Sequence, residues 1–237
     1  MNASELYEAG RLDEAIEALG VALRSDPTDV RRRVFLFELL CFAGEYDRAE
    51  KQLDVLARAG RDAEMGALLY RAALHGERTR REMFAAGPQP GGPAPPAVAG
   101  TLNGDPFGSL MDADPRIGAR LEVFIAGQYT WLPLEHVASV HMAPPQRLRD
   151  LLWAPAVVRP AESFRALELG ELLMPVLTPE ASRHEDAAVR LGRVTDWLEL
   201  ADGRAYPVGQ KLLLVDGEEL PILEVRELTI AGASPGD

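Results

Sequence analysis

The chain has 237 residues, of which 25 are Lys or Arg and 37 are Asp or Glu, so its formal net charge is −12. An acidic chain lacks the basic footprint that general nucleic-acid binding and attachment to anionic membranes require. Its single cysteine cannot form an internal disulfide, no apolar run approaches the ~20 residues of a membrane span, and the first residues do not resemble a signal peptide. We therefore expect a cytoplasmic protein with no nucleic-acid partner and no membrane insertion.

The first 84 residues have a helical pattern and contain an internal repeat. The segments AGRLDEAIEAL (9–19) and AGEYDRAEKQL (43–53) agree at five positions that are 34 residues apart. A period of 34 residues is that of the tetratricopeptide repeat, a helix–turn–helix unit. The residues with turn and packing roles in these units are Gly10, Ala15, Leu19, Pro27, Gly44, Ala49 and Leu53.

The residue types fit stacked helix pairs. Gly10 and Gly44 supply the turn between paired helices, and Pro27 prevents the second helix from continuing. Small Ala15 lets two helices approach closely, and Leu19 fills the seam between them. We therefore predict helices at 3–9, 12–24, 29–43, 46–58 and 62–84. The alternative is a plain helical bundle with a chance match to the repeat.

The fifth predicted helix is typical of an extended capping helix. It has an apolar face and a basic C-terminal stretch, whose arginines we interpret as a solvated surface. The apolar residues are Met65, Leu68, Leu69, Ala72 and Ala73, and the basic ones are Arg78, Arg80 and Arg81. Because such stacks need roughly three units for stability, we expect the helices to pack against the C-terminal half.

A segment rich in proline and glycine separates two halves of different character. Residues 85–100 read AAGPQPGGPAPPAVAG, a composition that neither continues a helix nor fills a core. We therefore place a tetratricopeptide-like helical domain at 1–84, a Pro/Gly-rich linker at 85–105 and an antiparallel β domain at 106–237.

The C-terminal half alternates short β-branched or aromatic runs with Gly, Pro and Asp. Hairpins are predicted around Gly127, Asp202-Gly203 and Asp216-Gly217, because these residues accept the backbone of tight turns. The last of these hairpins pairs 211–215 with 220–228. Further strands are predicted at 137–142, 155–160 and 167–174, with a short helical turn at 146–153. The predicted fold class is α+β: N-terminal tetratricopeptide-like helical repeats followed by a C-terminal antiparallel β barrel-like domain, either a small barrel or a strongly curved sheet.

Three short motifs follow one another along the C-terminal half. They are Asp112-Ala113-Asp114-Pro115-Arg116-Ile117-Gly118, Asp150-Leu151-Leu152-Trp153 and Leu191-Gly192-Arg193-Val194-Thr195-Asp196-Trp197. In this order, after a short tetratricopeptide-like segment, the set resembles the ImpE/TagJ (SciE-type) family of accessory proteins of the bacterial type VI secretion system. The resemblance extends over nearly the whole chain.

The resemblance implies a non-enzymatic adaptor without a cofactor. Members of the family are linked to the contractile sheath, through a helix of its small subunit, and to the AAA+ ATPase that disassembles contracted sheaths. The implied role is to modulate sheath turnover, with either or both as partners. Two surfaces remain open as the docking site: the groove of the helical repeats, or an exposed β edge.

The first motif has a structural and a chemical interpretation. Asp114 before Pro115 is typical of a turn, and Arg116 is suited to pair with Asp112 or with a carboxylate from the C-terminal part. The pair Asp112 and Asp114 also has the spacing that binds a divalent cation, although no EF-hand spacing follows. The alternative function is therefore a metal-dependent enzyme or sensor that uses these carboxylates.

The other motif residues have core or interface interpretations. Arg193 is expected to form a buried charge pair with Asp196 or Asp150 that joins the two halves. The three tryptophans are expected in the core, and they are Trp131, Trp153 and Trp197.

Catalytic motifs are weak. The order of Ser182, His184 and Asp186 leaves open a hydrolytic triad, but the sequence has no G-x-S-x-G elbow and no phosphate-binding glycine motif.

Overall fold

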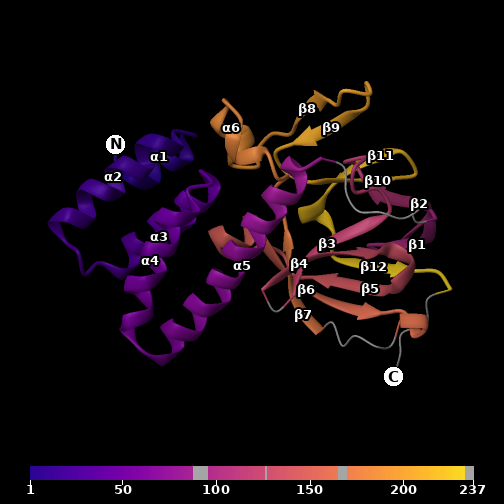
Figure 1. Ribbon diagram of the computed structural model, residues 1–237, viewed down its shortest axis with the longest axis horizontal. Helices are drawn as coiled ribbons and strands as arrows, with labels where there is room; N and C mark the ends of the chain where they lie inside the picture. Colours follow the sequence, from indigo (N-terminus) through magenta and orange to yellow (C-terminus); the bar gives the residue numbers. More distant parts are fainter. Residues whose placement is uncertain (88–95, 126, 165–169, 233–237) are drawn as a thin grey trace.

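The computed structural model describes residues 1–87, 96–125, 127–164 and 170–232. Five α-helices form the N-terminal half, and a large antiparallel sheet forms most of the C-terminal half, with α5 (Arg61–Ala85) between them (Figure 1). Residues 88–95 of the predicted Pro/Gly-rich linker lie outside the described residues. No helix among the described residues combines the length and the hydropathy that a membrane crossing requires.

The helices pack as consecutive antiparallel neighbours, as helical repeats do. They are α1 (Ala3–Glu8), α2 (Leu12–Ser25), α3 (Val30–Phe42), α4 (Tyr46–Leu56) and α5, with the 3-10 turn η1 (Ala57–Ala59) before α5. The five predicted helices are confirmed, with ends that differ by at most two residues. Gly10 and Gly44 have φ of 76° and 69° at the turns within the first two pairs, a left-handed conformation that glycine adopts without a steric penalty.

The repeat positions form the core of the helical half. Ala15, Leu19, Ala49 and Leu53 are buried, whereas Pro27 is exposed in the turn that ends α2. Residues 36–42 of α3 are all buried because α2 and α4 pack on one side of this helix and the C-terminal half covers the other. The apolar character of α3 therefore reflects burial on two sides.

The large sheet has ten strands in the order β11-β10-β2-β1-β12-β5-β6-β7-β3-β4, and every neighbouring pair is antiparallel. Its strands are β1 (Val98–Leu102), β2 (Asp105–Asp112), β3 (Arg120–Ile125), β4 (Gln128–Pro133), β5 (Val137–Met142), β6 (Trp153–Pro160), β7 (Gly170–Pro175), β10 (Leu212–Val215), β11 (Glu218–Pro221) and β12 (Glu227–Ile230). A separate hairpin consists of β8 (Asp196–Glu199) and β9 (Ala205–Val208).

Short helical turns connect the strands. They are η2 (Leu134–His136), η3 (Leu148–Leu151), η4 (Glu162–Phe164), η5 (Ala181–Arg183), α6 (Ala187–Arg190) and η6 (Ile222–Glu224). The turn η3 confirms the short helical segment predicted within 146–153.

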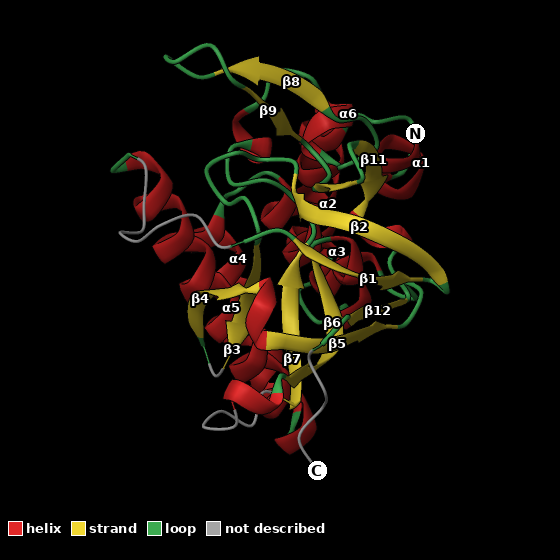
Figure 2. Ribbon diagram, turned by 90° about the vertical axis from the view of Figure 1, so that its right-hand side faces the viewer, coloured by secondary structure: helices red, strands yellow, loops and turns green. Residues whose placement is uncertain are grey.

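The sheet curls strongly, with β2 crossing over the ends of the central strands (Figure 2). Its two edges are β11 and β4, so it forms a half-barrel. The prediction of a barrel-like antiparallel domain is therefore confirmed only in part. The predicted α+β class and the three hairpins, β3–β4, β8–β9 and β10–β11, are confirmed.

Three segments of the sheet differ from the sequence-based expectation, and one of them is strand β2, which no predicted strand covers. The strand predicted at 220–228 is wrong, because β11 ends at Pro221 and η6 separates it from β12, which pairs with β1 and β5. Strand β1 forms within the segment assigned to the linker. Its Val98 and Leu102 are buried, and Gly100 fits because a Cβ there would lie 2.0 Å from the carbonyl oxygen of Thr229.

Candidate functional site

The C-terminal half covers the face of the helical stack that a peptide-binding repeat leaves open. Helices α1, α3 and α5 are the first helices of successive pairs and line the concave side of such a stack. Trp153, which is 2% exposed, lies against Phe37 of α3 and Tyr70 of α5, with ring centroids 6.4 and 5.8 Å apart. Its indole N–H donates to Glu77 Oε1 of α5 at 3.1 Å. The sequence segment 150–153 thus occupies the expected groove from within the chain.

Arginines from the third motif region extend this closure to α1 and α2. Arg193 donates to the carbonyl oxygens of Glu8 and Tyr7, at 2.9 and 2.7 Å, and lies 4.8 Å above the Tyr7 ring. These carbonyls are at the C-terminal end of α1, where a cation is favourable. Arg190 forms a bidentate salt bridge with Asp13 of α2, with both hydrogen bonds at 2.9 Å. The repeat groove is therefore closed along its length by the C-terminal half.

The expected pairing of Arg193 with Asp196 or Asp150 is wrong, because both carboxylates have other partners. Asp196 contacts His184 at 3.1 Å. Asp150 accepts from two backbone N–H groups at the start of η3, both at 2.9 Å. Arg193 still joins the two halves, but through helix carbonyls.

The expected core position of Trp197 is also wrong. Trp197 is 37% exposed, and all four residues of β8 are exposed. The hairpin extends away from the large sheet, so neither of its faces is fully covered (Figure 1). By contrast Trp153 is buried, and Trp131 is half-buried against Phe84 of α5, with ring centroids 5.8 Å apart.

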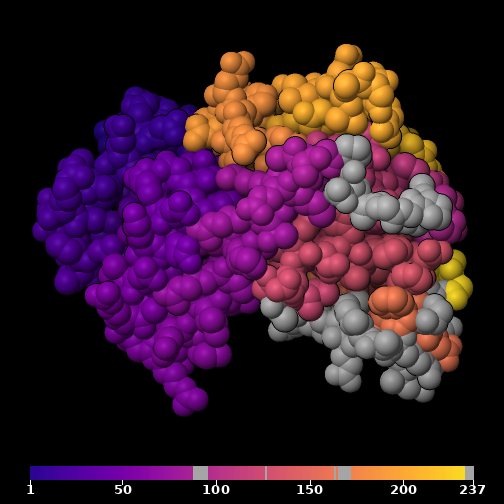
Figure 3. Space-filling view, viewed as in Figure 1, coloured from indigo at the N-terminus to yellow at the C-terminus, as the bar shows by residue number. Residues whose placement is uncertain are grey.

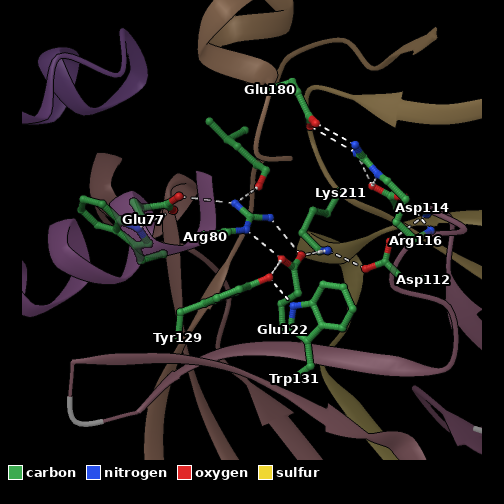
Figure 4. Close-up of polar contacts among 12 residues, drawn as sticks. Glu77, Arg80, Asp112, Asp114, Arg116, Glu122, Tyr129, Trp131, Glu180 and Lys211 are labelled. Carbon is green, nitrogen blue, oxygen red and sulfur yellow. Dashed lines mark hydrogen bonds and ion pairs between the residues drawn. The ribbon is translucent and has the colours of Figure 1, made fainter. Parts of the chain in front are cut away.

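A buried network of charged side chains links α5 to the sheet (Figure 4). Arg80 of α5 donates to both carboxylate oxygens of Glu122 in β3, at 2.8 and 2.9 Å, and to the carbonyl oxygen of Leu177 at 2.8 Å. Lys211 donates to the same Glu122 and to Asp112 Oδ2. The four charged side chains are each at most 4% exposed. We call Arg80, Asp112, Glu122 and Lys211 the buried charge network.

Desolvation and pairing set the titration of this network. Burial alone would raise the pKa of Glu122, but Arg80 and Lys211 outweigh it and hold that pKa well below its ordinary value. Burial raises the pKa of Asp112 to about 6, since Lys211 offsets only part of the desolvation and the charge of Glu122 adds to the rise. Burial opposes the charge of Lys211, but its two carboxylate partners raise its pKa overall. Of the two carboxylates, Asp112 therefore takes up a proton first as the pH falls.

The first motif forms a turn closed by an arginine clamp. The carbonyl of Asp114 accepts from the backbone N–H groups of Ile117 and Gly118, the latter with φ of 64°. Arg116 binds Asp114 and also Glu180, with shortest bonds of 2.6 and 2.8 Å. Its guanidinium lies 4.7 Å from the Phe84 ring centroid and 4.2 Å from that of Tyr206. Arg116 thereby connects the motif to the end of α5 and to the β8–β9 hairpin.

The partners of Asp112 and Asp114 show whether these carboxylates are free to bind a divalent cation. Asp112 is bonded to Lys211, and Asp114 is bonded to Arg116. A carboxylate that neutralises an adjacent cation is a poor metal ligand, because the metal would have to displace that cation. In the described part of the chain, no three His, Cys, Asp or Glu side chains are grouped so as to hold a metal ion.

The hydrolytic alternative lacks the required geometry. The Ser182 hydroxyl accepts from Arg81, and the two ring nitrogens of His184 contact Asp196 and the backbone N–H of Asp186. The contacts described for Ser182 and His184 thus hold a loop against α5 and do not form a nucleophile–base pair.

The sequence pattern predicted a solvated helix face for Arg80, and no motif included Glu122 or Lys211. Arg80 is 1% exposed, so the solvated assignment is wrong for this residue. The sequence does indicate that two of these charges are buried. Glu122 is the charged residue within the apolar run 121–125, and Lys211 directly precedes the apolar run 212–215. A charge inside an apolar strand must be paired when it is buried.

Comparisons with known proteins agree with this architecture. Residues 104–229 match the ImpE protein family, and residues 6–72 match a tetratricopeptide repeat. Over 96% of its length, the chain is 36% identical to the type VI secretion system accessory component TagJ of Pseudomonas aeruginosa, of which it covers 90%. The chain belongs to the ImpE family. A crystal structure of a Vibrio parahaemolyticus protein has the same fold, with a TM-score of 0.82 at 22% identity, and the match covers 96% of this chain and 97% of the other.

Among the described residues of this ImpE-family chain, two groups of neighbouring apolar side chains remain exposed after the halves have joined. One is on the N-terminal part of α5, and the other is on the β8–β9 hairpin. The residues are Met65, Leu68 and Leu69 on α5, and Val194, Trp197 and Leu198 at the hairpin. Single exposed apolar residues are common on protein surfaces, whereas groups of them often mark interaction sites.

Proposed function

We propose that this chain is a non-enzymatic adaptor of the type VI secretion system, acting in the cytoplasm. It binds a helix of the small subunit of the contractile sheath, the AAA+ ATPase that disassembles contracted sheaths, or both, and so modulates sheath turnover. The observation that carries the proposal is the likeness to TagJ, described as an accessory component of that system, along almost the whole of both chains.

The side-chain chemistry supports a binding role. The acidic residues of the first motif are neutralised by Lys211 and Arg116, and the serine and histidine of the 182–186 segment contact other groups. The described residues also include exposed apolar groups on α5 and at the β8–β9 hairpin, and such groups are typical of protein interaction sites. A helix that lays its apolar face on such a patch is a common mode of recognition.

Isothermal titration calorimetry tests the proposal. The full chain is titrated with synthetic peptides that cover the helices of the cognate sheath small subunit, and separately with the cognate AAA+ ATPase. We expect saturable binding of one sheath helix or of the ATPase, with no binding of a scrambled peptide of the same composition. The absence of binding to every sheath helix and to the ATPase, with complexes also absent in gel filtration, would contradict the proposed function.

A further inference from the structure

The apolar face of α5 is buried at one end and exposed at the other. Toward its C-terminal end, a Cβ added to Gly76 would lie 2.4 Å from the Phe124 ring, and one added to Gly127 would lie 3.2 Å from the Cβ of Ala72. This part of the face therefore packs against the β3–β4 hairpin. Toward the N-terminus the same face continues with side chains that are 49–60% exposed, and they are Leu69, Leu68 and Met65. We call these three residues the α5 stripe.

The exposure of the α5 stripe follows from the length of the helix. With 25 residues, α5 is roughly 37 Å long at 1.5 Å per residue. Its N-terminal part runs past the end of the sheet, whereas its opposite face stays packed on α4 (Figure 1). In Figure 3 the end of the helical half that contains the start of α5 projects beyond the rest of the described surface. The stripe thus continues an established apolar interface onto a part of α5 that the described strands do not cover.

Charged side chains surround the α5 stripe, with Asp62 and Glu64 beside it and the exposed Arg61 on the same face one turn before Met65. At 100° per residue, Asp62 lies on one side of the stripe and Glu64 on the other. Both are exposed, and neither has an ion pair among the described residues. The chain as a whole has a formal charge of −12. A partner with an apolar face and basic flanks is therefore complementary to this surface.

We propose that the α5 stripe is the docking site for the partner helix of the proposed function, on which this inference rests. The occupant is an amphipathic helix with apolar side chains spaced at i, i+3 or i+4 and i+7, and with Lys or Arg on the borders of that face. Met65, Leu68 and Leu69 are spaced at i, i+3 and i+4, so they share one face of α5 on which such a helix can pack. The repeat groove is not the docking site, because Trp153 and Arg193 occupy it.

Binding by stripe variants tests this assignment. Calorimetry compares the wild-type chain with the double variant Leu68→Asp/Leu69→Asp, using the sheath small-subunit helix peptide that binds the wild type. We expect at least a tenfold loss of affinity, since apolar anchors at a helix interface dominate binding. The melting temperature should fall only slightly, because Leu68 and Leu69 are 59% and 49% exposed and the main cost of the change is the weaker helix propensity of Asp. The matched control is Val21→Asp on α2, a 54% exposed apolar residue outside the stripe, and it should bind as the wild type does.

The outcomes separate this inference from the proposed function. If the wild type binds and the double variant binds within twofold of it, the docking assignment is overturned while the proposed function stands. Loss of binding in Trp197→Ala with retained binding in the stripe variant would place the partner on the β8–β9 hairpin and also overturn the assignment. If the wild type binds no sheath helix, a sheath helix is not the partner of the α5 stripe and the inference is overturned. If the wild type also fails to bind the ATPase, the proposed function is overturned as well. A weakening of wild-type affinity at higher salt supports the basic flanks of the partner.

Discussion

Asp112 and Glu122 are both buried and share one lysine, yet their pKa values are shifted in opposite directions. Glu122 has a bidentate arginine and the lysine, whereas Asp112 has the lysine and one backbone N–H. Because removing one member of a buried pair leaves the other charge unpaired, such networks are costly to break. The sequence shows which charges lie inside apolar runs, but it does not show that Arg80 meets Glu122. That pairing depends on the docking of α5 onto the sheet.

The raised pKa of Asp112 predicts how stability depends on pH. The folded state retains this proton up to about pH 6, whereas the unfolded chain releases it near its ordinary value of 3.8. The unfolded state then binds fewer protons between these values, so this group lowers the free energy of unfolding as pH rises from about 4 to 6. The shift corresponds to at most about 3 kcal/mol. Urea unfolding of the wild type and of Asp112→Asn should show the wild type losing stability relative to the variant over that range. A relative gain with rising pH would contradict the raised pKa.

Helix α5 has two packing partners, and its sequence is adapted to both. Gly76 allows the Phe124 ring to approach the helix, and Arg80 one turn later reaches the sheet. The periodicity of the sequence predicted the helix and its apolar face, and the stripe belongs to that face. It did not predict which part of the face is covered, because the β3–β4 hairpin contacts only the C-terminal part. Strands β1 and β2 were missed, and β12 was joined to β11 in one predicted run, for a similar reason, since strands are stabilised by partners distant in sequence.

Two glycines in α5 provide a matched test of this packing. In an exposed helix, Gly→Ala stabilises by about 1 kcal/mol. At Gly66 nothing lies within 4 Å of an added Cβ, so Gly66→Ala should raise the free energy of unfolding. At Gly76 the Cβ would overlap the Phe124 ring, so Gly76→Ala should lower it by about 1–3 kcal/mol despite the better helix propensity. Chemical denaturation measures both, and equal stabilisation by the two substitutions would show that α5 does not pack closely on β3.

The whole molecule differs from a peptide-binding repeat protein in one respect. Its helical stack has the expected period and packing, but the concave face is filled by the chain's own C-terminal half through Trp153, Arg190 and Arg193. The sequence predicted both halves and their joining. It did not predict that the joining removes the groove, because that depends on the relative placement of the halves. Among the described residues, the α5 stripe, the β8–β9 hairpin and the sheet edges β4 and β11 remain open to a partner.

Hydrogen–deuterium exchange of the full chain, alone and saturated with the proposed partner, a helix of the sheath small subunit, tests the account most directly. We predict slower exchange in the complex over residues 61–72, with exchange unchanged at 148–153 and in α1 and α3, because the repeat groove stays closed. Faster exchange at 148–153 together with protection of α1 and α3 would show that the partner helix displaces the C-terminal half from the groove, and would contradict the account.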